Sequence, residues 1–172
     1  MGEILLYPIL LPLLGGIIIL LLPKKVKSLW GIVASLFTFL SFLFSGLLSL
    51  FPTLLLSFPQ IQWPKVGWEF LLTSEPFRNF ILLGTFFFGF LISLYSIRKM
   101  ARNQRLREYY VYFLWTIAFS GLAILSDNFL LFLFAWGVVA VFLYLLISLG
   151  KPGAERAANK ALVMVGGSDI LM

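Results

Sequence analysis

Three ionisable side chains within or beside the long apolar segments of the sequence could bind protons or cations: Asp127, Lys160 and Asp169. Charged groups in apolar surroundings are costly to place, and they mark ion pathways. Asp127 stands in the turn Ser126-Asp127-Asn128, where a carboxylate would accept hydrogen bonds from the N–H groups that begin the next segment. We therefore interpret Asp127 as a helix N-cap first and as an ion-pathway residue second.

Lys160 and Asp169 lie in the last segment of the chain. If a helix begins near Glu155, Lys160 stands just over one turn in, where its amine either extends to the aqueous interface or takes part in ion transfer. Asp169 follows roughly 13 Å further along the helix axis, where a carboxylate needs a protein partner or water. Gly166 and Gly167, just before it, allow a close helix approach or a local break.

The residue types exclude most other chemistry. The sequence contains no Cys and no His, which excludes disulfides, thiolate and imidazole metal ligands and Ser–His catalysis. It shows neither a glycine-rich phosphate loop nor carboxylates paired at helical spacing, and acid–base catalysis needs such groups to converge in one pocket. We therefore expect no catalytic residue, no metal site and no cofactor on this chain.

The segments around these residues are long enough to cross a bilayer. Of the 172 residues 61% are hydrophobic and 12% are charged, whereas a soluble domain carries about 25% charged residues. A helix needs about 20 apolar residues to cross the hydrocarbon, and an isolated strand cannot satisfy its backbone there. We predict an all-α integral membrane protein with five complete transmembrane helices plus the start of a sixth, in a single membrane domain spanning 1–172. The predicted spans are 4–22, 29–50, 77–97, 109–125, 128–149 and the partial 155–172.

Basic residues are concentrated in the connections that follow the first, third and fifth spans. Because cytoplasmic loops are rich in Lys and Arg, this asymmetry predicts an extracytoplasmic N-terminus. The net charge of +6 is interpreted in the same way, so no nucleic-acid partner is expected. The residues concerned are Lys24, Lys25, Lys27, Arg98, Lys99, Arg102, Arg105, Arg107, Lys151, Arg156 and Lys160.

The long connection 52–76 is predicted to be an extracytoplasmic loop. It contains four prolines, and Trp63 and Trp68 suit the membrane interface as anchors. A functional lid or a partner site is the alternative interpretation. From Pro59 to Leu72 apolar and polar residues alternate roughly, which indicates a short hairpin.

Several short motifs follow one another in a fixed order along the chain. They are Pro12-Leu13-Leu14-Gly15-Gly16, Leu94-Tyr95-Ser96, Tyr109-Tyr110 after the Arg-rich connection, the run from Ser126 to Trp136, Tyr144-Leu145-Leu146-Ile147, Ala157-Ala158-Asn159-Lys160-Ala161-Leu162 and Gly167-Ser168-Asp169. In this order they resemble the N-terminal part of the antiporter-like membrane subunits. That superfamily includes subunits of respiratory complex I (the proton-translocating NADH-quinone oxidoreductases), group 4 membrane-bound hydrogenases, formate hydrogenlyases and Mrp-type cation/proton antiporters.

The resemblance implies a longer architecture with inverted repeats, of which this chain would end inside the sixth helix, as a fragment or as a shortened subunit. Family members usually read Trp-Glu in the fifth helix, and that glutamate pairs with a lysine of the seventh helix. This chain reads Trp136-Gly137 instead. Lys160 matches the sixth-helix lysine of the family. Because its neighbours are apolar, we expect Gly137 to form a helix-packing notch.

The resemblance implies an antiporter-like membrane-arm subunit, or a fragment of one, in a redox-driven proton- or cation-translocating complex of the prokaryotic inner membrane. Other membrane subunits and hydrophilic redox subunits would be its partners, and electrons would flow only in those partners. The first alternative is a non-conducting scaffold or assembly subunit, which Gly137 favours. The second is a fragment of a multi-pass membrane enzyme, which the lack of a polar cluster disfavours.

Overall fold

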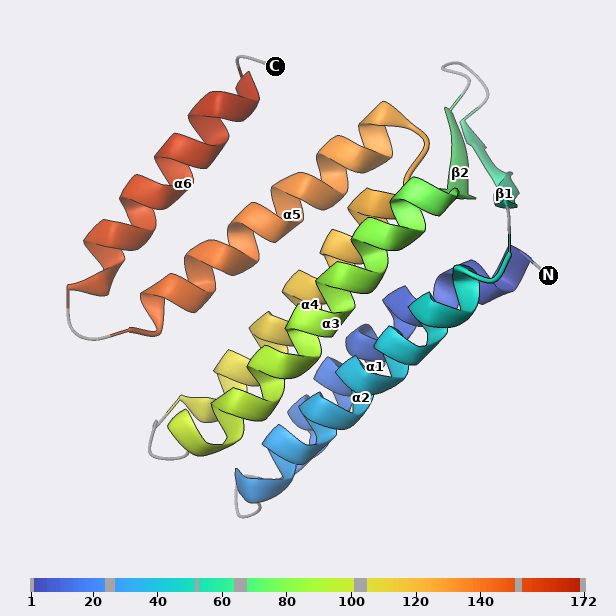
Figure 1. The fold of residues 1–172 in the computed structure, drawn as a ribbon. Helices are drawn as coiled ribbons and strands as arrows, with labels where there is room; N and C mark the ends of the chain where they lie inside the picture. The colour runs from blue at the N-terminus through green and yellow to red at the C-terminus, as the bar shows by residue number, and fades with distance from the viewer. Residues whose placement is uncertain are drawn as a thin grey trace.

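The computed structural model describes residues 2–23, 27–51, 53–63, 68–100, 105–150 and 153–170. Within these ranges the chain forms six α-helices, a short 3₁₀ turn and one β-hairpin (Figure 1). The elements are η1 (Gly2–Leu6), α1 (Tyr7–Leu21), α2 (Lys27–Leu48), β1 (Leu54–Trp63), β2 (Trp68–Ser74), α3 (Pro76–Lys99), α4 (Leu106–Leu125), α5 (Phe129–Ser148) and α6 (Ala154–Ile170).

The helices pack side by side in a bundle, in which α5 and then α6 are added at one side of the first four helices. α1 packs against α2 and α4, α2 against α3, and α4 against α5. α6 packs against α5 at the edge of the bundle, away from α1 and α2 (Figure 1). The first four helices therefore share a core, whereas α5 and α6 leave much of their surface uncovered by the described residues.

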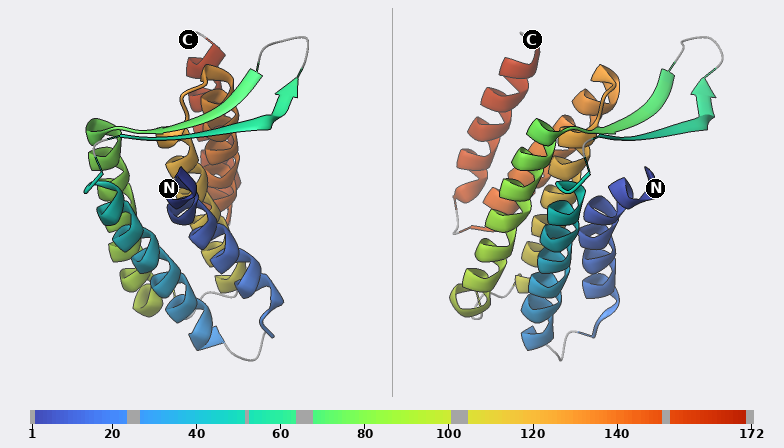
Figure 2. Two further views of the ribbon diagram at one scale, coloured as in Figure 1. Left: turned by 90° about the vertical axis from the view of Figure 1, so that its right-hand side faces the viewer. Right: turned by 45° about the vertical axis from the view of Figure 1, so that its right-hand side comes forward.

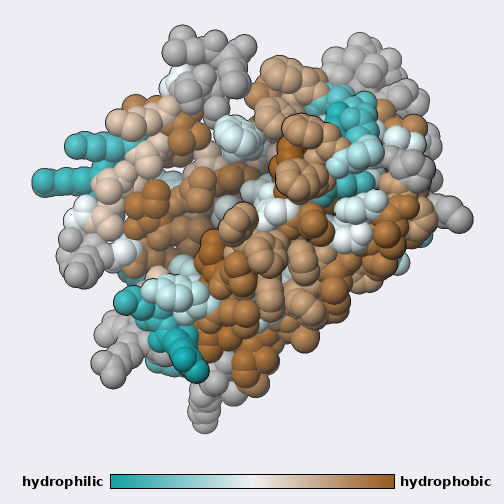
Figure 3. All heavy atoms as spheres, in the orientation of Figure 1, coloured by the Kyte–Doolittle hydropathy of each residue, from teal (hydrophilic) through white to brown (hydrophobic). Residues whose placement is uncertain are grey.

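Five of the helices are long and apolar enough to cross a membrane: η1 with α1, most of α2, and α3, α4 and α5. In hydrocarbon, a long apolar segment satisfies its backbone hydrogen bonds by forming a helix. On the face that Figure 3 shows, apolar side chains cover the middle of the bundle, and hydrophilic ones gather towards its ends. The prediction of a largely helical, multi-pass membrane protein is thereby confirmed by length and composition, whereas its orientation stays a prediction.

One β-hairpin lies in the long connection between α2 and α3, where the sequence indicated a short hairpin within the all-α membrane class. β1 and β2 pair antiparallel from Leu54 opposite Ser74 to Phe58 opposite Phe70. Both strands run across one end of the bundle rather than along it (Figure 2). The alternation noticed from Pro59 to Leu72 therefore identified the hairpin but placed its first strand too late in the chain.

The N-cap of α5 is Asn128, not Asp127 as predicted. Oδ1 of Asn128 accepts a hydrogen bond from the N–H of Leu130 at 2.9 Å. Asn and Asp are nearly equal as N-caps, so whichever residue stands directly before the first helical turn takes the position. Asp127 stands one residue too early, and its carboxylate has another partner.

Candidate functional site

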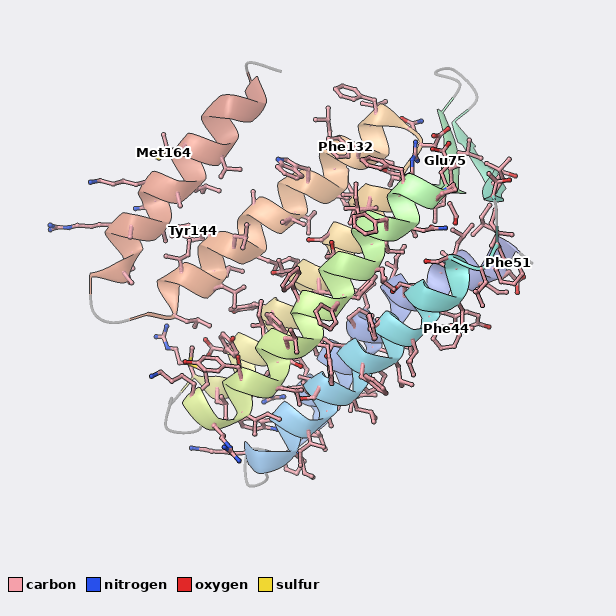
Figure 4. The ribbon with its side chains drawn as sticks, viewed as in Figure 1. Phe44, Phe51, Glu75, Phe132, Tyr144 and Met164 are labelled. Carbon is pink, nitrogen blue, oxygen red and sulfur yellow. The ribbon has the colours of Figure 1, made fainter. Side chains whose placement is uncertain are left out.

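The Asp127 carboxylate forms an ion pair with Arg78, which lies in the first turn of α3. Nη2 of Arg78 is 2.9 Å from Oδ1 of Asp127, and its Nη1 donates to the carbonyl oxygen of Ser126 at 3.1 Å. Glu75, at the junction of β2 and α3 (Figure 4), adds a second carboxylate 3.8 Å from Nε of Arg78. We call Glu75, Arg78 and Asp127 the Arg78 cluster.

The Arg78 cluster joins three parts of the fold at the hairpin end of the bundle. The N–H of Asp127 also donates to the carbonyl oxygen of Leu71 in β2 at 3.0 Å, and Leu72 forms a β-bridge with Ser126. The side chains of Arg78 and Asp127 are 26% and 38% exposed, so the ion pair itself contributes no more than about 1 kcal/mol. The geometry of the Arg78 cluster indicates a structural role, in which it connects the hairpin, α3 and the turn before α5.

A buried amide completes this connection beside α2. Asn79 is almost fully buried; its Nδ2 donates to the carbonyl oxygen of Leu48 at 3.2 Å, and its Oδ1 accepts from the hydroxyl of Ser74 at 2.8 Å. The last turn of α2, the end of β2 and the start of α3 are thus connected through one side chain. Buried polar groups that find partners on several elements in this way fix the arrangement of those elements.

Lys160 lies in the second turn of α6, and its side chain is exposed. Among the described side chains no carboxylate lies within ion-pair distance of its amine. Lys160 and Asp127 lie near opposite ends of α5. Asp127 precedes the start of α5, whereas α6, which carries Lys160, begins beside the end of α5 (Figure 1). A helix of 20 residues is about 30 Å long, so the structure does not bring these two candidates together.

Asp169 belongs to α6, near the end of that helix. Its side chain lies outside the part of the chain that the structure describes. The expected need for a buried partner or water at Asp169 therefore stays a prediction.

Gly137 lies on an open face of α5, in the middle of the helix. A Cβ atom built at Gly137 would meet no described atom within 4 Å, and Trp136 beside it is 43% exposed. The predicted helix-packing notch is therefore wrong for the described residues. Because α5 is apolar all round, the sequence gives no sign of which face packs inward, and Gly137 turns out to lie on the outer one.

A row of hydroxyl groups lies between α2 and α3, and it was not predicted from the sequence. Ser35, Thr38, Ser41 and Ser45 are buried and recur every three or four residues along α2, so they share one face of that helix. Thr38 contacts Ser93 of α3 through their hydroxyl oxygens at 3.1 Å. Each hydroxyl of this row also donates to a carbonyl oxygen of its own helix. The row indicates helix packing through small polar residues, and its spacing was the signal that could have revealed it.

Comparison with known proteins gives a partial similarity. Over 78 residues the chain is 37% identical to NADH-quinone oxidoreductase subunit L of Mycobacterium tuberculosis, in the sequences of strains CDC 1551 / Oshkosh and ATCC 25618 / H37Rv. The match covers 44% of this chain and 12% of the relative, so only a small part of the relative's length is represented. No model of a known protein family matches the chain. The similarity supports the expected relation to the antiporter-like subunits of complex I over the matched part.

Proposed function

We propose that this chain is an antiporter-like part of the membrane arm of a redox-driven, proton- or cation-translocating complex of the NADH-quinone oxidoreductase type. The similarity to subunit L carries the proposal, and five helices able to cross a membrane are consistent with it. The chain would belong to a complex of several subunits in a prokaryotic cell membrane, with the redox chemistry in hydrophilic partners.

A structural contribution to such a complex is favoured over proton conduction by this chain alone. The described ionisable side chains lie near the ends of the helices, in the connections or in α6, and the interior of the first four helices holds hydroxyl and amide groups instead. Gly137 cannot bind a proton, and the face around it is open. Conduction through α5 and α6 would therefore need ionisable groups from another helix or subunit.

Extraction in a mild detergent tests the proposed membership. With an affinity tag on the chain, hydrophilic iron–sulfur subunits are expected to copurify, together with further membrane subunits. If hydrogenase subunits copurify in place of NADH-oxidising subunits, the complex is of the membrane-bound hydrogenase type. Recovery of the chain without any redox subunit, from membranes in which the complex is intact, would contradict membership.

The proposed orientation places the hairpin outside and the basic end of the bundle inside. The Cys-free chain allows single cysteines at Thr53, before β1, and at Lys99, at the end of α3; both are exposed and lie at opposite ends of the bundle. An impermeant thiol reagent added to intact cells should label Thr53→Cys, and Lys99→Cys only after lysis. The reverse labelling pattern would show that the proposed direction of every span is wrong.

We expect Lys160 to contribute to ion transfer in the assembled complex. Lys160→Ala and Lys160→Gln should reduce proton pumping several-fold in reconstituted vesicles without loss of assembly, whereas Lys160→Arg keeps the charge and should retain most activity. Arg156→Gln, an exposed cation one turn earlier in α6, is the matched control. Normal pumping by both neutral Lys160 variants would show that the amine only extends to the interface.

A further inference from the structure

A pocket of about 440 Å³ opens at the end of the bundle opposite the hairpin. Its lining residues come from the last turn of α1 and the first turns of α2 and α4. These helix ends lie at the same end of the bundle as the end of α3 (Figure 1), which carries Arg98 and Lys99. The wall of the pocket contains the cations Lys27, Arg105 and Arg107, the carboxylate Glu108, and the aromatic side chains of Trp30 and Tyr112. Three cations against one carboxylate leave the pocket with an excess of positive charge.

The positions of these cations on their helices increase that excess. Lys27 is the first residue of α2, Arg105 is the N-cap of α4, and Arg107 stands in the first turn of α4. The N-terminus of a helix already carries a partial positive charge, so cations there repel it, and an anion relieves the repulsion. The N-cap residue Arg105 offers no side-chain acceptor to the first N–H groups of α4, and such N–H groups suit an anion.

A buried hydrogen-bond donor in the wall gives independent support. Trp30 is 3% exposed and lines the pocket, yet its Nε1–H has no hydrogen-bond acceptor among the described residues. Buried donors are almost always paired, and leaving one unpaired destabilises the fold. An acceptor oxygen brought to that edge of the ring would satisfy the indole.

The guanidinium of Arg107 is held at the wall of the same pocket. Its Nε donates to the carbonyl oxygen of Ile19 in α1 at 3.2 Å. This bond fixes the plane of a group that binds phosphate oxygens in pairs. The side chain of Arg107 is therefore held in place as part of the pocket wall.

Apolar surface continues from the pocket along α1. Leu20 lines the pocket and is 42% exposed, and Leu21 beside it is 80% exposed. In a chain that crosses a membrane, these side chains lie at the depth where acyl chains meet the headgroup region. Basic pockets between membrane helices on the cytoplasmic side bind anionic headgroups.

We propose that this pocket binds the phosphate headgroup of an anionic phospholipid, with its acyl chains along the end of α1. The phosphate oxygens accept from the basic side chains and from the indole of Trp30, and the anion compensates the positive ends of α2 and α4. The proposal does not depend on the redox role of the complex. Such a lipid would fix the mutual positions of α1, α2 and α4 at this end of the bundle.

Lipid retention by the full chain tests the site. The purified chain is exchanged into detergent with phosphatidylglycerol or phosphatidylcholine, and retained lipid is counted by native mass spectrometry. Phosphatidylglycerol should be retained preferentially. Each interfacial cation is worth about fivefold in affinity for anionic lipid, so Lys27→Gln with Arg105→Gln should weaken retention about 25-fold. Arg98→Gln with Lys99→Gln removes two exposed cations at the same end but outside the pocket, and should change it little.

Trp30→Phe separates lipid binding from folding. It removes the unpaired donor together with part of a buried ring, so the lipid-free Tm is measured first, and lipid retention should fall severalfold in variant protein that the Tm shows to be folded. Millimolar inorganic phosphate should not displace the lipid; displacement at that level would identify a free phosphate as the ligand and overturn the lipid assignment. Equal losses in the pocket and control double variants would show unspecific charge attraction and would also overturn it.

Discussion

Gly16→Ala is expected to destabilise the bundle by about 2 kcal/mol, within the range for overpacked cores. A Cβ at Gly16 would overlap the indole of Trp115 on α4. That indole has little room to move away, because its Nε1 donates to the carbonyl oxygen of Leu13 and its ring packs edge-on against Phe142 of α5, with centroids 5.5 Å apart. The new methyl group must therefore separate α1 from α4 or displace Trp115 into α5.

The matched control is Gly84→Ala in α3. A Cβ there would meet nothing within 4 Å, and alanine is a better helix former than glycine by about 1 kcal/mol. The two substitutions make the same chemical change and should shift stability in opposite directions. Thermal unfolding in detergent, followed by circular dichroism, measures both. A Gly16→Ala protein as stable as Gly84→Ala would mean that α1 does not approach α4 through Gly16.

The spanning helices could be predicted because their apolar runs leave the backbone one arrangement in hydrocarbon. Pro76 marks the start of α3 for a local reason, since proline suits the first turn of a helix. Such signals lie within a few residues of the feature that they predict. The presence of five apolar helices was accordingly within reach of the sequence.

The parts that could not be predicted depend on distant residues or on helix rotation. Asp127 pairs with Arg78, which lies 49 positions away, and no local pattern indicates that contact. Leu54 and Leu55, at the start of β1, are both apolar, so alternation does not reveal where the first strand begins. Gly137 stands in a helix that is apolar all round, and only the packing of α4 and α6 against α5 decides which of its faces is open.

Gly137→Glu tests whether that open face meets lipid or another polar group. The side chain would fit, because a Cβ at this position meets no described atom. The position is the ninth of 20 residues in α5, about 13 Å from its start and thus near the middle of a span. A charged side chain at the centre of a membrane helix costs about 2.5–3.5 kcal/mol. We therefore expect the isolated chain to insert and fold less well with glutamate.

Three variants at this position separate charge from size. Gly137→Ala should leave the stability of the chain unchanged or raise it. Gly137→Gln should lower the stability less than Gly137→Glu does. Only the stability lost in Gly137→Glu should be restored by an amine from another chain. The folded fraction is measured for the isolated chain and for the assembled complex. Rescue in the complex alone would place a partner's cation on this face of α5, because pairing offsets the cost of a charge in hydrocarbon. A glutamate variant of the isolated chain as stable as the alanine one would show that water already reaches α5 there, and a purely structural role for this part of the module would then be wrong.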